Sequence, residues 1–192
     1  MKQLIIYSHP NPASFNHAIL EALSRVLLAR GDEVIVRDLY AMRFDSVLKG
    51  ADFEALQKGK VTADVKTEQD HIRWADAITF IFPVWWASMP AMTKGYIDRV
   101  FSLGFAYSVD AEGLKGLLEG KKVMIISTHG APESYYADCG MHRSMGQTID
   151  DGIFRFCALE LVGHRYFGEV PTTTPENRAR MLVQVAEVAK LL

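Results

Sequence analysis

Five short runs of apolar residues, each about the length of a β-strand, alternate along the chain with longer segments in which apolar residues recur every three or four positions. The strand-like runs lie at residues 2–8, 32–38, 77–83, 121–128 and 161–170. The segments with helical spacing lie at residues 15–30, 67–75, 91–103, 148–160 and 175–192. Continuous apolar runs are typical of strands buried on both faces of a parallel sheet, and the helical spacing is typical of helices that cover it. The pattern therefore predicts an α/β fold.

Five strands with intervening helices fit a doubly wound parallel sheet of order 2-1-3-4-5 with helices on both faces. Gly31 follows the first helical segment, as glycine often does where a helix ends. Two stretches break the rhythm: residues 41–66 predict a long excursion with one short helix, and residues 104–120 carry a mixed signal. Because ligands bind at the carboxyl ends of such strands, we expect a site in the loops after Ser8, Phe82 and Thr128.

Composition and charge describe one ordinary domain spanning residues 1–192. The chain has 21 Lys and Arg against 23 Asp and Glu, a net charge of -2, and 49% hydrophobic residues. A chain of this length can bury a substantial core. With no basic block, nucleic acid or an anionic membrane is not expected as a main partner, and small-molecule chemistry is favoured.

The chain shows no sign of export or membrane insertion. Its N-terminal apolar run has no small-residue cleavage site, and no stretch is long enough to span a bilayer. Cys139 and Cys157 lack any CxxC spacing, so we expect a reduced, cytoplasmic protein with two bystander thiols.

The first loop, SHPNPASFN, contains neither glycine-rich phosphate fingerprint. A helix N-terminus nevertheless offers unpaired amides and a positive dipole end. Ser14 alone is best explained as a helix cap. His9, Ser14 and Asn16 together favour a phosphate site.

The second loop places Trp85 and Trp86 between Pro83, which ends the strand, and Pro90, which suits a first helical turn. Two explanations are balanced: packing onto the adjacent helix, or a wall for a flat aromatic ligand. Further along, Lys94, Asp98 and Arg99 are predicted to form a solvated helix face.

The third loop, after Thr128, is rich in polar and aromatic groups that could donate hydrogen bonds to an anion developing on a ligand. His129, Cys139 and His142 match no standard ligand spacing, so we predict no metal site. The GxSxG nucleophile motif of hydrolases is absent.

These loops resemble those of the flavodoxin-like NAD(P)H:quinone oxidoreductases, over nearly the whole chain. The matching motifs are SxPxxxSFN ending at Asn16, DLYAMRF at 38–44, FPxxWxxxPAxxKGxxxRVFxxxFAY at 82–107, TxGxxxSxY followed by GMH, and FC at 156–157. The long motif at 82–107 is the most specific. The resemblance implies a single flavin-binding domain with a flavodoxin-like fold.

The resemblance also implies roles for individual residues. The flavin phosphate would be held by His9, Ser14, Phe15 and Asn16. The isoalloxazine would be lined by Pro83, Val84, Trp85 and Trp86 on one side and by Thr128, His129 and Gly130 on the other. The catalytic pair would be Tyr136 and His142, the nicotinamide and quinone pocket would include Tyr107 and Phe156, and the adenine end of FAD would meet Arg178 and Leu182. Since Trp85 and Trp86 are adjacent, we expect one to face the ligand and the other to pack into the protein.

The implied reaction is hydride transfer from NADPH or NADH to flavin N5 and then two-electron reduction of a quinone in the same pocket. A homodimer is implied, with Tyr107 reaching across the interface. FAD is favoured by Arg178 and Leu182, while the missing C-terminal extension leaves FMN open. The choice between NADPH and NADH is also open, because no determinant of the ribose 2′ position is recognisable.

Two departures from the mammalian members leave substrate preference open. His129 and Gly130 stand where those members have two glycines, and Val109 replaces a pocket tyrosine. Three rival functions remain: a one-electron flavodoxin carrier, an ancillary regulatory subunit of a potassium-efflux transporter, and a nitro- or azo-compound reductase.

Overall fold

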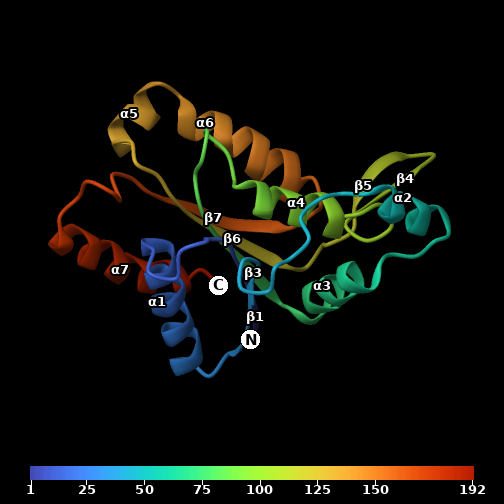
Figure 1. Cartoon of the computed structure of the whole chain (residues 1–192), viewed down its shortest axis with the longest axis horizontal. Coiled ribbons are helices and arrows are strands. Elements are labelled where there is room, and N and C mark those ends of the chain that lie inside the picture. The colour runs from blue at the N-terminus through green and yellow to red at the C-terminus, as the bar shows by residue number, and fades with distance from the viewer.

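The computed structural model describes residues 1–192 and has a five-stranded parallel sheet at its centre (Figure 1). The strands are β1 (Lys2–Tyr7), β2 (Glu33–Asp38), β3 (Ala77–Pro83), β6 (Lys122–Thr128) and β7 (Glu160–Phe167). Their order is β2-β1-β3-β6-β7, and all four neighbouring pairs are parallel. Counted by sheet strands alone this is 2-1-3-4-5, so the predicted strand order is confirmed.

The helices follow the predicted rhythm with some additions. They are α1 (Phe15–Ala29), α2 (Gly50–Gln57), α3 (Ala63–Trp74), α4 (Ala91–Val100), α5 (Glu133–Asp138), α6 (Met141–Met145), the π-helix η1 (Gly146–Arg155) and α7 (Pro175–Ala189). At the end of η1, Phe156 N–H donates to Asp151 O, five residues earlier, which is the wider π spacing. No helix of the chain is both long and apolar enough to cross a membrane.

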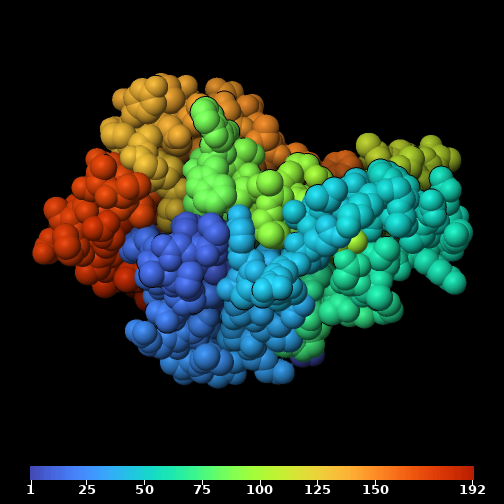
Figure 2. Space-filling view, in the orientation of Figure 1, coloured from blue at the N-terminus to red at the C-terminus, as the bar shows by residue number.

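The two irregular stretches resolve differently. The excursion at 41–66 contains the expected short helix, α2, and also the first turn of α3. Residues 104–120 contain a small antiparallel hairpin, β4 (Tyr107–Asp110) with β5 (Gly113–Gly116), which the sequence pattern did not predict. Its strands are mostly exposed, so they lack the apolar alternation that marks a strand. With α2, the hairpin extends from one end of the molecule (Figures 1 and 2).

The core consists of two clusters that take alternate residues of the strands. Leu4 and Ile6 of β1 belong to the larger cluster, to which α4 and η1 also contribute. Ile5 and Tyr7 belong to the other, to which α1 and α7 contribute. Because successive side chains of a strand point to opposite faces, the sheet is covered by side chains on both.

Local signals set the ends of α1. The Ser14 side chain accepts a hydrogen bond from His17 N–H at 3.2 Å and so caps the first turn. Gly31, with φ +86, follows the last turn in the left-handed region, where glycine meets no steric penalty. The predicted end of this helix is confirmed.

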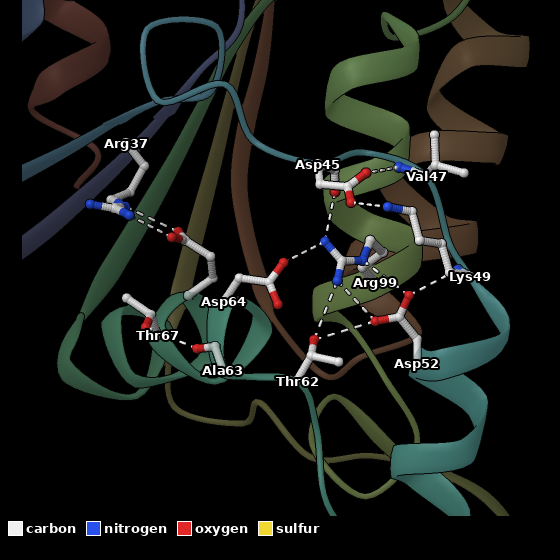
Figure 3. A network of polar contacts seen from close by, with 11 residues as sticks. Arg37, Asp45, Val47, Lys49, Asp52, Thr62, Ala63, Asp64, Thr67 and Arg99 are labelled. Carbon is white, nitrogen blue, oxygen red and sulfur yellow. Dashed lines mark hydrogen bonds and ion pairs between the residues drawn. The ribbon is translucent and has the colours of Figure 1, made fainter.

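Arg99 of α4 joins the excursion to the body of the protein (Figure 3). Its guanidinium donates to Asp52 at 2.9 and 3.2 Å, to Asp64 at 2.6 Å and to the backbone oxygen of Asp45 at 2.7 Å. The Arg99 side chain is only 4% exposed and that of Asp52 only 8%. This one side chain therefore ties α4 to α2, α3 and the loop before them.

The predicted solvated face of α4 is wrong for Arg99. Lys94 and Asp98 do form an exposed pair four residues apart. Arg99 is buried instead, against partners that lie 35 to 54 positions earlier in the chain. Periodicity within α4 cannot reveal partners so distant in sequence.

Replacing Arg99 by leucine is expected to lower the free energy of unfolding by about 3 to 5 kcal/mol, because Asp52 would keep its charge in a buried site without a counter-ion. Urea denaturation at pH 7 measures this. Lys94→Leu, which breaks an exposed pair on the same helix, should change stability by less than about 1 kcal/mol. Equal effects of the two substitutions would contradict the assignment.

The same network predicts an acid dependence. Burial alone would raise the pKa of Asp64, but hydrogen bonds from Arg99 and Thr62 outweigh it and lower this pKa to about 2 from 3.8. The stabilisation is therefore complete above about pH 4 and is lost as the pH falls toward 2. In Arg99→Leu this part of the acid sensitivity should disappear from urea titrations at low pH.

Candidate functional site

A cavity of about 280 Å³ opens where β1, β3 and β6 end. It is lined by His9, Ser14, Phe15, Asn16, Pro83, Val84, Trp85, Thr128, His129, Gly130, Val170 and Pro171. The three loops singled out from the sequence therefore meet in one place. Of the predicted cofactor-binding residues, only Trp86, Arg178 and Leu182 do not line it.

The N-terminus of α1 forms the anion-compatible part of this cavity. The backbone amides of Phe15 and Asn16, the first two residues of the helix, have no acceptor in the protein. Nδ1 of His9 accepts a hydrogen bond from Asn11 N–H at 3.0 Å, and Nε2 makes no hydrogen bond within the protein. Burial lowers the pKa of His9, although a hydrogen bond with Asn11 opposes this. Free amides at a positive dipole end match the requirements of a phosphate.

Asn16 leaves one polar atom without a partner. Its side-chain amide nitrogen donates to Thr128 Oγ1 at 2.8 Å, while its Oδ1 is buried and accepts no hydrogen bond. Buried polar atoms are nearly always paired, so this oxygen fits a donor supplied by a ligand. A flavin, which carries both a phosphate and a ring N–H, fits the donor and acceptor set of the cavity.

The two tryptophans occupy a tight turn between β3 and α4. Trp85 N–H donates to Ser88 O at 2.9 Å and Ser88 N–H donates to Trp85 O at 3.1 Å. Between them Trp86 and Ala87 have φ values of 51 and 56, in the left-handed region. Trp85 lines the cavity beside the imidazole of His9, at 6.1 Å between ring centroids.

Trp86 is 101% exposed, so the expectation that one tryptophan packs into the protein is wrong. The left-handed turn directs Trp86 away from the protein, and the turn projects from the surface (Figure 2). Trp86 contributes nothing to the wall of this cavity within one chain.

The predicted catalytic residues gather with His129, and we call His129, Tyr136 and His142 the histidine–tyrosine group. The rings of His129 and Tyr136 stack at 4.5 Å with an angle of 22°. The Nε2 atoms of His129 and His142 share a hydrogen bond of 3.2 Å. Tyr136 and His142 are not among the lining residues of the cavity, but both contact His129, which is.

Burial sets the charge of this group. It lowers the pKa of His129, with a smaller contribution from His142. It also lowers the pKa of His142, although the carboxylate of Glu133 opposes this. Both imidazoles are therefore held neutral near pH 7, and one Nε2 atom donates to the other. The Tyr136 hydroxyl makes no hydrogen bond in the protein, which leaves it free for a ligand.

The remaining predicted residues lie away from the cavity. The rings of Tyr107 and Phe156 contact each other at 5.6 Å, and Tyr107 lines a separate hollow of about 420 Å³ beside α2. Arg178 donates to the backbone oxygen of Val170 at 2.7 Å and so supports the cavity wall from behind. Leu182 packs against the core cluster of α1 and α7.

Val170 and Pro171 line the cavity but were missed in the sequence. They follow β7, the fifth strand of the sheet. Ligands bind at the carboxyl ends of strands, and this rule applied to β7 would have identified both residues.

No three His, Cys, Asp or Glu side chains are grouped so that they could hold a metal ion. The Cys139 thiol contacts the backbone oxygen of Tyr136.

Known proteins resemble the chain in both sequence and fold. Residues 1–189 match a protein family described by its flavodoxin-like fold. An NAD(P)H oxidoreductase of Haemophilus influenzae is 34% identical, over 97% of this chain and 93% of its own. NAD(P)H dehydrogenase [quinone] 1 of Cavia porcellus is 33% identical, over 94% of this chain and 73% of its own.

Among solved structures, an NAD(P)H:quinone oxidoreductase from Methanothermobacter marburgensis superposes with a TM-score of 0.89 at 26% identity, covering 98% of this chain and 95% of that one. The chain belongs to the flavodoxin-like family that includes the bacterial and mammalian NAD(P)H:quinone oxidoreductases.

Proposed function

We propose that this protein is a flavin-dependent NAD(P)H:quinone oxidoreductase that works by two-electron hydride transfer. The observation that carries the proposal is the cavity itself, where a helix N-terminus, an indole wall and the histidine–tyrosine group converge on the carboxyl edge of the sheet. The names of the relatives support it. The proposal treats residues 1–192 as one doubly wound domain, supported by the two core clusters that take alternate strand residues.

In this proposal, the phosphate of the flavin binds the free amides of Phe15 and Asn16 with His9 beside it. The flat ring system lies between Trp85 and the backbone of Thr128 to Gly130. A bound flavin supplies the hydride chemistry. The protein positions the flat partners, excludes water and stabilises developing charge.

Tyr136 and His142 stabilise the negative charge that develops on the ligand. The Tyr136 hydroxyl is free to donate a hydrogen bond, and His142 can hold or pass a proton at Nε2 through His129. Donors held ready in a partly buried site stabilise a developing anion more strongly than water does.

We propose FAD as the flavin, with FMN as the alternative. Arg178 uses only Nη1 to hold the Val170 backbone, so the rest of its guanidinium is available to a ligand. Beside α7 a polar hollow of about 350 Å³ is lined in part by Glu169, Asn177 and Arg180, and Glu169 directly precedes Val170 of the cavity wall. This hollow offers room for an adenine end. Heat release of the bound flavin followed by chromatography identifies it. A coupled assay with NADPH and NADH identifies the donor.

We also propose a homodimer. Leu103, Val109 and Phe156 are each at least 40% exposed around the end of the molecule that carries Tyr107. Tyr107 and Phe156 do not line the flavin cavity of their own chain, so they can contribute to such a cavity only from a second copy. Light scattering is expected to give a dimer, and a monomer with full activity would contradict the shared pocket.

His9→Ala is expected to weaken flavin binding about tenfold, because one hydrogen bond to the phosphate is lost. Fluorescence titration of the apoprotein with flavin measures this. His71→Ala on α3, outside the cavity, is the control and should bind flavin as the parent does. Equal affinity in the two variants would place the phosphate elsewhere.

Tyr136→Phe combined with His142→Gln should slow flavin reduction by NAD(P)H roughly 100-fold while the flavin stays bound, because the donors that stabilise developing charge are removed. Stopped-flow absorbance of the fully loaded protein follows the step directly. An unchanged rate in a loaded double variant would remove both residues from the mechanism.

A further inference from the structure

Three partly buried polar side chains continue the series of contacts that begins with the histidine–tyrosine group. The ring of Tyr166 on β7 stacks on His142 at 4.3 Å with an angle of 27°. His164, two residues earlier on the same strand, stacks on Tyr166 at 3.9 Å with an angle of 21°. Asp150 of η1 places its Oδ1 at 2.8 Å from His164 Nδ1. The proposed function assigns no role to these three residues.

The hydrogen bonds define the state of His164. A carboxylate accepts hydrogen bonds but does not donate them, so Nδ1 of His164 carries the proton that faces Asp150. The Tyr166 hydroxyl oxygen, 3.0 Å from the same Nδ1, shares that proton. Nε2 lies 3.0 Å from Ser127 Oγ and shares a hydrogen bond with it. Both nitrogens of His164 therefore have partners that fix the plane of its ring.

Ser127, His164 and Asp150 have the order of a nucleophilic triad, but they cannot act as one. Ser127 lies within β6 and has no exposed surface, so no substrate can reach its hydroxyl. The side chains of His164 and Asp150 are only 5% and 13% exposed. The arrangement holds side chains in place rather than presenting a nucleophile.

His142 depends on this arrangement because it has few other contacts of its own. Its one hydrogen bond runs from Nε2 to His129, and nothing in the protein bonds to its Nδ1. A single hydrogen bond leaves the His142 ring free to rotate about the line between the two Nε2 atoms. The stacked face of Tyr166 and the edge contact with Tyr136 at 5.6 Å remove that freedom.

Tyr166 is suited to a passive role. Burial, with a smaller effect of the Asp150 carboxylate, raises the pKa of its hydroxyl, so it stays protonated throughout the neutral range. Its ring is therefore an uncharged stacking partner between the imidazoles of His142 and His164.

We propose that Asp150 and His164 position His142 through Tyr166. Asp150 sets the tautomer of His164, His164 holds the Tyr166 hydroxyl, and the Tyr166 ring fixes the plane of His142 beside His129. All three are positioning residues, since none lines the cavity. The effect on catalysis rests on the proposed function, whereas the effect on the His142 ring does not.

The test is nitrogen-15 NMR of histidine-labelled protein without cofactor, which reports the tautomer and mobility of each imidazole. His142→Gln assigns the His142 signals. We expect the signals of one fixed ring for His142 in the parent protein, and averaged signals of a mobile ring in Asp150→Asn and His164→Gln. Asp151→Asn is the matched control, because this neighbouring carboxylate is 57% exposed and pairs with Arg155 at the surface.

Unchanged His142 signals in folded Asp150→Asn and His164→Gln would overturn the proposal. Should either substitution prevent folding, Tyr166→Phe decides: it keeps the ring and removes only the hydroxyl that contacts His164. Averaged His142 signals in that variant support the proposal, and parent-like signals overturn it.

A second measurement separates this proposal from the proposed function. In flavin-loaded His164→Gln we expect flavin reduction to slow about tenfold, from misplacement of His142, with unchanged flavin affinity. If the Tyr136 and His142 double variant reduces flavin at the parent rate, the proposed function of that pair fails, while the NMR result still decides the positioning. If the double variant is slow but His164→Gln is not, the catalytic effect of the positioning is refuted.

Discussion

Thr128 connects the parts of the site to the sheet. It is the last residue of β6 and pairs in register with Pro83 at the end of β3. Its hydroxyl accepts a hydrogen bond from the buried Asn16 side chain, and its backbone oxygen accepts one from Val84 N–H at 2.7 Å. One residue therefore fixes the start of α1 and the start of the tryptophan turn relative to the strands. The parallel register makes this possible, because it brings the ends of these strands to the same edge.

Burial near this edge explains the chemistry of the histidine–tyrosine group. His129 directly follows β6 and its side chain is nearly inaccessible, so its charged form is disfavoured. The stacked ring of Tyr136 and the bond to His142 provide partners that do not require charge. The result is a neutral group with donors close to the cavity. A neutral donor can stabilise an incoming negative charge without repelling a cationic nicotinamide.

The sequence was most informative where one physical signal acts locally. Continuous apolar runs identified all five strands of the sheet, because burial on both faces leaves no polar alternation. The same signal predicted the position of the cavity, because the ends of the strands mark the loops that line it. Pairs distant in sequence were not visible: Arg99 meets Asp52, and Ser127 meets His164, only after the strands and helices are placed. Residues that act behind the cavity, such as Tyr166 and Asp150, belong to this second class.

Trp86 combines an unfavourable backbone conformation with a fully exposed side chain. Left-handed backbone at a bulky residue costs roughly 1 kcal/mol or more, and here two consecutive residues adopt it. The two hydrogen bonds between Trp85 and Ser88 close the turn, but they would close equally well around glycine or asparagine. Exposing an indole completely brings no stabilisation within the chain. The turn is therefore not explained by the stability of the isolated chain, and its indole is available to whatever meets this edge of the sheet.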